Sequence, residues 1–170
     1  MDKEFVDRLT HEEAHDQKKI QFIYHMKNQP LLLDPDNQVQ KWLEKLYNQE
    51  NSTDQIIYTK ESFTGAHKSV EHAMKEGKTL VIFIEHGINS FSSEIIASIK
   101  ASEIGNGRQL VDYNKNMLYL SPNFQLLFCC KSKNPVIDPS TTLHHPTINF
   151  EISQSSLKKR LLLETLKSEN

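Results

Sequence analysis

The sequence predicts an α/β domain with a mainly parallel sheet, helices on both of its faces and a hairpin insertion. Short continuous apolar runs such as Thr79–Ile84 are typical of parallel strands that are covered on both sides. Segments with helical spacing alternate with these runs, which favours strands joined by helical crossovers. A turn-forming triplet, Asn114-Lys115-Asn116, separates two apolar stretches and predicts the hairpin.

The strands are expected where apolar runs are bounded by turn residues. The first run is closed by Asp34-Pro35, because the residue before a proline avoids helical geometry. The expected strands lie within residues 30–33, 56–58, 79–84, 110–113, 117–120, 124–130 and 147–152.

The helices are expected where apolar residues recur on one side. Val39, Trp42, Leu43 and Leu46 follow the i, i+3, i+4, i+7 spacing of an amphipathic helix. A second helix is expected over residues 62–76, with Phe63 on its apolar side and Gly77 as its stop. A third carries Ile95, Ile96 and Ile99 and is expected to end at residues 105–107, and Ser155 or Ser156 could cap a last one.

Composition and charge exclude several classes of protein. Among 170 residues, Lys and Arg number 20 against 22 Asp and Glu, so no basic excess exists to neutralise a nucleic-acid backbone. The charged start, residues 1–19, lacks the apolar core of a signal peptide, and the longest apolar run, residues 80–84, is too short to span a membrane.

The two cysteines, Cys129 and Cys130, are adjacent and would point to opposite faces of a strand. They indicate reduced thiols in an intracellular protein.

A nucleotide site is the first function to test in such a domain. A phosphate loop requires the pattern G-x-x-x-x-G-K-[ST], and Gly77-Lys78-Thr79 comes nearest to it. His72 stands where the first glycine is needed, and the triplet enters a strand instead of leaving one. Glu85 follows the 79–84 strand, at the place of a magnesium-linked carboxylate, but its neighbour is His86. A surface carboxylate is the main interpretation, and a residual metal-contacting Glu is the alternative.

Other chemistry has weak support. His11-Glu12-Glu13-Ala14-His15 matches the zinc pattern H-E-x-x-H, but it lies in a charged stretch without an apolar face or a third ligand. His144-His145 precedes Pro146 in an expected loop and is interpreted as polar filler. Cys130 closes an apolar strand and is interpreted as a buried structural thiol, although Lys131 and Lys133 could lower its pKa.

Several segments, taken in order, resemble the fifth AAA+ module of dynein heavy chains. Pro30-Leu31-Leu32-Leu33-Asp34-Pro35, followed by Gln38 and Trp42, is similar to an element of that module. Residues 77–82 resemble one of its strands, and residues 106–124 match its glycine-bounded hairpin. Lys133-Asn134-Pro135 and residues 148–163 are similar to two later elements. The individual motifs are unspecific, whereas their order and spacing are specific.

The resemblance implies a fold and a division of the chain. Residues 30–170 would form a partial three-layer AAA+ large subdomain that is incomplete at its N-terminus. Residues 1–29 would be a charged segment, partly helical or disordered. The phosphate-loop equivalent is expected upstream of Pro30, where the usual segment is not recognisable.

The resemblance also implies a degenerate nucleotide site without catalytic residues, cofactor or metal. Phe83 and Ile84 stand where an active module holds its acidic pair, so the Walker-B-like strand end is reduced to Glu85. At the sensor-1-like strand end, Cys129 and Cys130 replace a pair of Thr residues ahead of Asn134.

The function implied by the resemblance is that of a non-catalytic structural module in the motor ring of a divergent, axonemal-type dynein heavy chain, or of a short isoform or fragment of one. It would contribute to ATP-driven movement toward microtubule minus ends only within the whole motor. Its partners would be the neighbouring AAA+ modules, and indirectly the dynein intermediate and light intermediate chains. Its location would be cytoplasmic or cytoskeletal, including the ciliary axoneme. Two alternatives are an NTPase or a zinc-dependent hydrolase using His11, Glu12 and His15, and a free-standing interaction protein that docks on a dynein.

Overall fold

A five-stranded sheet, all of whose strands run parallel, forms the centre of the computed structural model, with the strand order β2-β3-β7-β1-β8. The structure describes residues 29–49, 53–85, 87–105, 107–132, 135–136, 145–150, 158 and 161–162. The strands of this sheet are β1 (Leu31–Leu33), β2 (Ile56–Lys60), β3 (Thr79–Ile84), β7 (Gln125–Cys130) and β8 (Thr147–Asn149). The predicted parallel sheet is confirmed.

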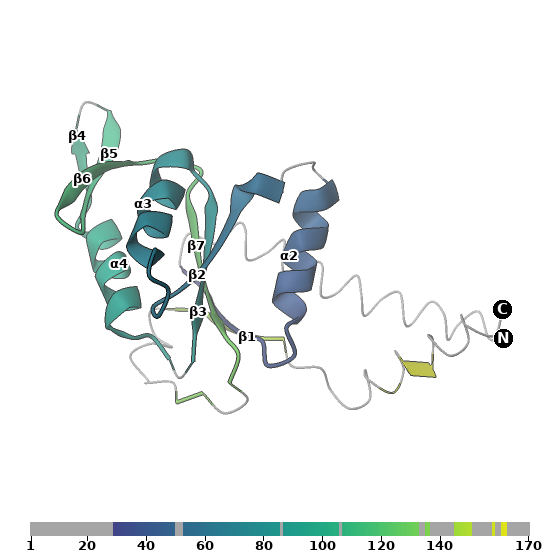
Figure 1. Cartoon of the computed structure of the whole chain (residues 1–170). Coiled ribbons are helices and arrows are strands. Elements are labelled where there is room, and N and C mark those ends of the chain that lie inside the picture. Colours follow the sequence, from purple (N-terminus) through teal and green to yellow (C-terminus); the bar gives the residue numbers. More distant parts are fainter. Residues whose placement is uncertain are drawn as a thin grey trace.

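Helices cover both faces of this sheet and make a three-layer arrangement (Figure 1). Helix α2 (Gln38–Gln49) lies on one face, and α3 (Ala66–Glu76) and α4 (Ser90–Lys100) lie on the other. A short 3-10 helix, η1 (Thr53–Gln55), leads from α2 into β2. The amphipathic helix predicted from Val39, Trp42 and Leu43 is confirmed, since all three side chains are buried.

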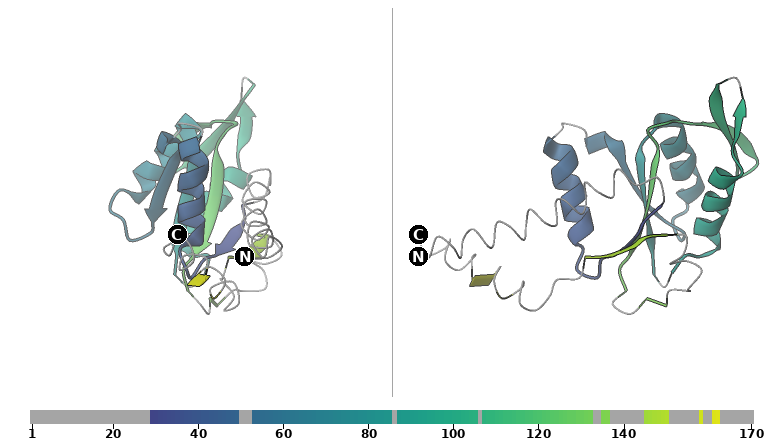
Figure 2. Two further views of the ribbon diagram at one scale, coloured as in Figure 1. Left: turned by 90° about the vertical axis from the view of Figure 1, so that its right-hand side faces the viewer. Right: turned by 180° about the vertical axis from the view of Figure 1, so that it is seen from behind.

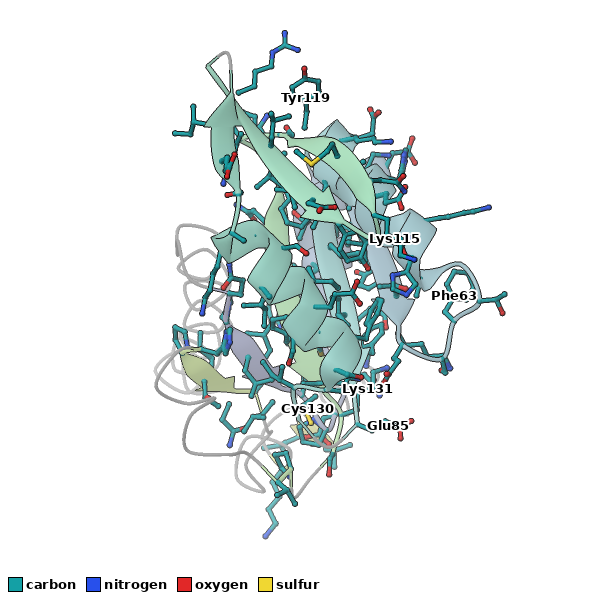
Figure 3. The ribbon with its side chains drawn as sticks, turned by 90° about the vertical axis from the view of Figure 1, so that its left-hand side faces the viewer. Phe63, Glu85, Lys115, Tyr119, Cys130 and Lys131 are labelled. Carbon is teal, nitrogen blue, oxygen red and sulfur yellow. The ribbon has the colours of Figure 1, made fainter. Side chains whose placement is uncertain are left out.

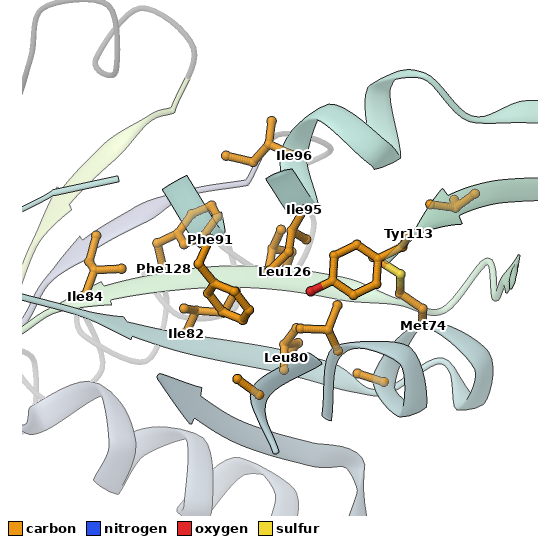
Figure 4. Close-up of a cluster of buried hydrophobic side chains, with 14 of the residues drawn as sticks. Met74, Leu80, Ile82, Ile84, Phe91, Ile95, Ile96, Tyr113, Leu126 and Phe128 are labelled. Carbon is orange, nitrogen blue, oxygen red and sulfur yellow. The ribbon is translucent and has the colours of Figure 1, made fainter. Parts of the chain in front are cut away.

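The two faces of β3 bury side chains in two separate clusters. Leu80 and Ile82 belong to the larger cluster beneath α3 and α4, which is drawn in Figure 4. Val81 belongs to the cluster beneath α2, which also contains Trp42 and Leu43. A strand buried on both sides needs apolar residues at every position, which explains the continuous run in the sequence.

A second, antiparallel sheet forms the insertion between α4 and β7 (Figure 2). Its strands are β4 (Glu103–Gly105), β5 (Arg108–Tyr113) and β6 (Asn116–Leu120). The predicted hairpin is confirmed: Tyr113 pairs with Asn116 across a two-residue turn. Asn114 and Lys115 have φ of 50° and 63°, which is the geometry of a type I′ turn.

Two boundaries around the helices were predicted wrongly. Helix α4 ends at Lys100, and the missed strand β4 follows it and ends at Gly105. This strand has three residues, and exposed Glu103 and Ile104 give it no periodic pattern. Helix α3 begins at Ala66, not at residue 62, because residues 61–62 and 64–65 form turns and Gly65 is the N-cap of the helix. Phe63 therefore lies outside the helix and is 52% exposed.

At the two ends of the chain, fewer of the predicted elements can be compared with the structure. Strand β8 is shorter than the predicted 147–152, and residues 158, 161 and 162 are helical. Residues 1–28, Ser155 and Ser156 lie outside the described residues, so the predicted N-terminal segment and the last helix cap stay predictions. Within the described ranges, no helix has the length and apolar character needed to cross a membrane.

Candidate functional site

The carboxyl ends of the parallel strands meet at one edge of the sheet, where β1 lies between β7 and β8. The chain leaves β1 through α2 on one face, whereas α3 and α4 cover the opposite face (Figure 1). In open α/β sheets, ligands bind outside the strand ends at the point where the connections change face. A ligand would therefore be expected at the ends of β1, β3 and β7.

The loop between β1 and α2 surrounds the side chain of Asp34 at this position. Asp34 Oδ1 accepts a hydrogen bond from the Gln38 amide at 2.6 Å, and Oδ2 accepts one from the Val39 amide at 2.9 Å. The residue is only 1% exposed. The amide of Asp34 donates to the carbonyl oxygen of Cys130 at 2.8 Å, which ties the loop to the end of β7. The carboxylate thus occupies the N-terminus of α2.

The electrostatic environment of Asp34 combines burial with compensating interactions. Burial raises the pKa of the Asp34 carboxyl above its usual value, and the negative charge of Asp36 acts in the same direction. The amide hydrogen bonds from Gln38 and Val39 and the positive charge of Lys131 lower that pKa. The protein itself therefore supplies the groups that compensate this buried charge.

The unit formed by β1, its loop and α2 has the strand–loop–helix order of a phosphate loop. The sequence led us to expect the phosphate-loop equivalent upstream of Pro30, whereas this unit begins at Leu31 and lies at the change of face. Phosphate groups bind at helix N-termini because free amides and the helix dipole favour negative charge there. In this chain two of those amides are already bonded to Asp34.

The end of β3 presents apolar side chains at the positions where the resemblance predicts the acidic pair of an active module. Phe83 is half-buried, and its ring is stacked with that of Tyr58 at a centroid distance of 5.8 Å. Ile84 is 2% exposed and belongs to the core beneath α3 and α4. Glu85, the next residue, has an exposed side chain. Of these three residues, only Glu85 could contact a metal ion.

The two cysteines at the end of β7 lie on opposite faces of the sheet, as predicted: Cys129 in the cluster beneath α2 and Cys130 in that beneath α3 and α4. Both are free. Burial raises the pKa of the Cys129 thiol to about 12 and also raises that of Cys130. Since a thiolate is the reactive form, neither residue suits nucleophilic catalysis. Asn134, the third predicted residue here, lies outside the described residues.

Lys131 and Glu85 line an open cavity of about 720 Å³ at the ends of β2 and β3. Figure 3 shows them with Cys130 at one end of the molecule, away from Tyr119. The ammonium nitrogen of Lys131 lies 4.3 Å from the centroid of the Phe83 ring. Other charged and polar residues that line the cavity are Lys60, Glu61, Ser62 and Asn89. Because Glu61 accepts a hydrogen bond from Asn89 Nδ2 at 2.6 Å, its carboxylate already has a partner.

The predicted histidine sites have different outcomes. His11, Glu12 and His15 lie outside the described residues, so the zinc alternative stays untested by the structure. His145 is not polar filler: it is 5% exposed, and its Nδ1 lies 2.9 Å from the carbonyl oxygen of Gln29. Its ring contacts Phe128 edge-on. In the part of the chain that the structure describes, no cluster of three or more His, Cys, Asp or Glu residues could hold a metal ion.

Sequence reasoning missed the role of Asp34, although it identified the strand that Asp34 closes. The Asp-Pro pair was interpreted only as a stop signal. A signal was present in the next residues, because the helix begins four positions after a carboxylate and its first turn contains no acidic residue. Acidic groups are favoured at helix N-termini, so Asp34 and Asp36, the two acidic residues just ahead of α2, could have been suspected.

A parallel α/β sheet with this strand order and a strand-end site defines an AAA-like module. Comparison with families of known proteins makes the assignment specific. The chain belongs to the family of ATP-binding dynein motor regions, whose model matches residues 8–170. The resemblance of the sequence to a dynein heavy chain AAA module is thereby confirmed.

Individual dynein chains are also similar to this chain over most of its length. The chain is 26% identical over 145 residues to cytoplasmic dynein 2 heavy chain 1 from Mus musculus, which covers 82% of this chain. It is 25% identical over 140 residues to a cytoplasmic dynein heavy chain from Fusarium vanettenii, again over 82% of this chain. A ciliary dynein beta chain from Heliocidaris crassispina is 26% identical over 140 residues and 82% of this chain. The chain spans about 3% of the length of each of these relatives.

Proposed function

We propose that this chain acts as a non-catalytic structural module of a dynein heavy chain motor ring, corresponding to its fifth AAA+ module. The observation that carries this proposal is the position of Asp34. Its carboxylate is bonded to the two amides that would face a phosphate group at the N-terminus of α2. A nucleotide would have to displace a buried negative group to bind there.

The neighbouring strand ends support the same proposal. Hydrolysis in this class of site needs a magnesium ion held by an acidic residue at the end of the central strand. Phe83 and Ile84 occupy those positions here and offer no oxygen ligand, while Glu85 is exposed beyond them. The same strand end packs against Lys131, whose charge acts on Asp34. The chain would therefore bind no Mg-ATP.

The surface of the insertion suits a role in contacts between modules. Met117 and Tyr119 are 64% and 53% exposed, and both belong to strand β6 of the antiparallel sheet. Exposed apolar residues on one element are typical of surfaces that bind another protein part. We place the neighbouring AAA+ modules there as direct partners, with intermediate and light intermediate chains as indirect ones. The location would follow the parent motor, in the cytoplasm, on the cytoskeleton or in the axoneme.

The direct test is calorimetric titration of the purified chain with Mg-ATP and with Mg-ADP. Trp42 is the single tryptophan and lies in α2, so its fluorescence gives a second readout of binding at this loop. We expect neither binding heat nor a change in fluorescence. A dissociation constant in the micromolar range for either nucleotide would refute the proposal.

A further inference from the structure

The hydrogen bonds of Asp34 differ from those of an ordinary helix cap. A capping side chain normally belongs to the residue just before the helix and bonds to the second or third amide of that helix. Asp34 instead lies four residues before Gln38 and five before Val39, and it bonds to both amides. Asn37, which directly precedes the helix, adopts a φ of 54°. The loop thus curves around a carboxylate supplied by the end of a strand.

The backbone holds this carboxylate in place from two directions. The amide of Asp34 donates to Cys130, so its main chain continues the pairing between β1 and β7. The amide of Asn37 donates to the carbonyl oxygen of Asp34 at 3.4 Å and closes the loop. These contacts do not involve the carboxylate itself. The loop should therefore keep its shape when the carboxylate is removed.

Removal of the carboxylate would leave three groups that favour a negative charge. The amides of Gln38 and Val39 would lose the two carboxylate oxygens to which they donate, and the helix dipole adds a partial positive charge at the same point. The positive charge of Lys131 already acts on Asp34 and would act on any anion in its place. Removing the acceptor of the buried Val39 amide costs free energy, and a free anion that accepts a hydrogen bond from this amide would recover that free energy.

We propose that the Asp34 carboxylate is an intramolecular anion that fills an oxyanion site in this loop, so that its removal creates a site for a small free oxyanion. The inference deepens the proposed function, on which it rests, because it names the group that excludes phosphate from the loop. Asp34 acts here as an autoinhibitory contact built into the fold. The empty loop would accept a carboxylate-sized anion such as formate.

The experiment uses the full chain and sodium formate, with sodium chloride at equal ionic strength as the reference. Asp34→Ala removes the carboxylate. Asp34→Asn fills the same volume without charge, and Asp36→Ala removes a neighbouring charge from the same loop while leaving both Asp34 bonds. Thermal unfolding reports stabilisation by the anion, and amide NMR resonances of Gln38 and Val39 report its position.

We expect formate to raise the melting temperature of Asp34→Ala in a saturable way, with a dissociation constant in the millimolar range. The resonances of Gln38 and Val39 should shift with the same concentration dependence. The wild-type chain, Asp34→Asn and Asp36→Ala should show neither effect. Where Asp34→Ala does not fold without the anion, Asp34→Ser keeps one acceptor and leaves room, so the titration uses that variant.

Absence of these shifts in the folded Asp34→Ala or Asp34→Ser variant would overturn the inference, as would equal shifts in the wild-type chain. The outcome is separable from that of the proposed function. If the wild-type chain binds no Mg-ATP and the variants bind no formate, only the role of Asp34 as an internal anion fails. If the wild-type chain binds Mg-ATP, the proposed function is refuted, whatever the formate titration of the variants shows.

Discussion

The hydroxyl oxygen of Tyr113 lies 2.7 Å from Nδ1 of His67, so the hairpin insertion shares a hydrogen bond with helix α3. Tyr113 is fully buried. The His67 ring also contacts the Phe91 ring of α4 edge-on, with a distance of 5.2 Å between the ring centroids. One buried tyrosine of β5 is therefore linked through His67 to both helices of one face. Burial, with the negative charges of Glu94 and Glu71, raises the pKa of Tyr113, so the hydroxyl keeps its proton.

The first prediction separates this hydrogen bond from the packing of the ring. Tyr113→Phe should lower the free energy of unfolding by about 1 kcal/mol, because it removes only the hydroxyl group. Tyr113→Ala should lower it by about 3–5 kcal/mol, because it also leaves a cavity in the core. Urea denaturation followed by circular dichroism measures both. Equal losses in the two variants would show that the hydroxyl group, and not the ring, carries the stabilisation.

The second prediction concerns the turn between β5 and β6. Lys115 adopts a φ of 63°, a left-handed conformation that glycine reaches without steric cost and that type I′ turns favour. Lys115→Gly should therefore raise the free energy of unfolding by about 0.5–1 kcal/mol. As a matched control, Lys75→Gly within α3 should lower it by about 1 kcal/mol. A loss of stability in Lys115→Gly would contradict the assigned turn.

The third prediction is a pH dependence caused by Cys129. Burial raises the pKa of this thiol from 9.0 to about 12, the charge of Asp34 adds to the effect, and Lys131 opposes it. Between these values the folded chain binds one more proton than the unfolded chain at this residue. Its contribution to stability is therefore complete below pH 9 and is lost as the pH rises through 12.

The difference in free energy of unfolding between the wild-type chain and Cys129→Ala should fall by about 1.4 kcal/mol per pH unit across that window. Urea denaturation at a series of pH values measures this slope. The reaction of Cys129 with iodoacetamide should likewise be slow at pH 9 in the folded chain and fast after unfolding. A slope that is the same in both chains would show that the thiol titrates normally.

The fourth prediction compares two glycines with similar backbone angles. Gly77, at the end of α3, has a φ of 70°, and Gly107 has a φ of 74°. A Cβ atom on Gly77 would collide with the Ser121 hydroxyl, whereas one on Gly107 would meet no heavy atom within 4 Å. Gly107→Ala should cost about 1–2 kcal/mol, the strain of the left-handed conformation alone.

Gly77→Ala should lower the free energy of unfolding clearly more than Gly107→Ala. At Gly77 the collision of the new Cβ atom with Ser121 is added to the strain of the left-handed backbone. Thermal unfolding of both variants and of the double variant Gly77→Ala, Ser121→Ala checks this. The double variant should recover part of the additional loss, since the hydroxyl oxygen is removed. Equal losses in the two single variants would show that the Ser121 contact does not limit this position.

The predicted elements that the structure confirms are those with a strong local pattern. The run from Thr79 to Ile84 matches β3 at both ends, and the spacing of Val39, Trp42 and Leu43 places α2 correctly. The missed strand β4 shows the opposite case. Its residues are largely exposed and pair with β5, so nothing in their own pattern predicts a strand.

The candidate site was predictable only in part. The apolar ends of β3 and β7 could be identified from the sequence, because strand ends and family motifs coincide at Phe83, Ile84, Cys129 and Cys130. The role of Asp34 could not be derived in this way. Its carboxylate bonds to amides that become available only when α2 begins at Gln38, and its depth of burial depends on β7 lying alongside.

The sequence by itself determined the order of the strands of the central sheet and of the helices between them, because hydrophobic periodicity and turn residues act within a few positions along the chain. It also determined the family, through the order and spacing of motifs from Pro30 onward. The tertiary structure decided that β1 lies between β7 and β8, which brings Asp34 and Lys131 to the same edge of the sheet. That placement depends on pairing between strands about 100 residues apart, and such long-range pairing has no local signal in the sequence.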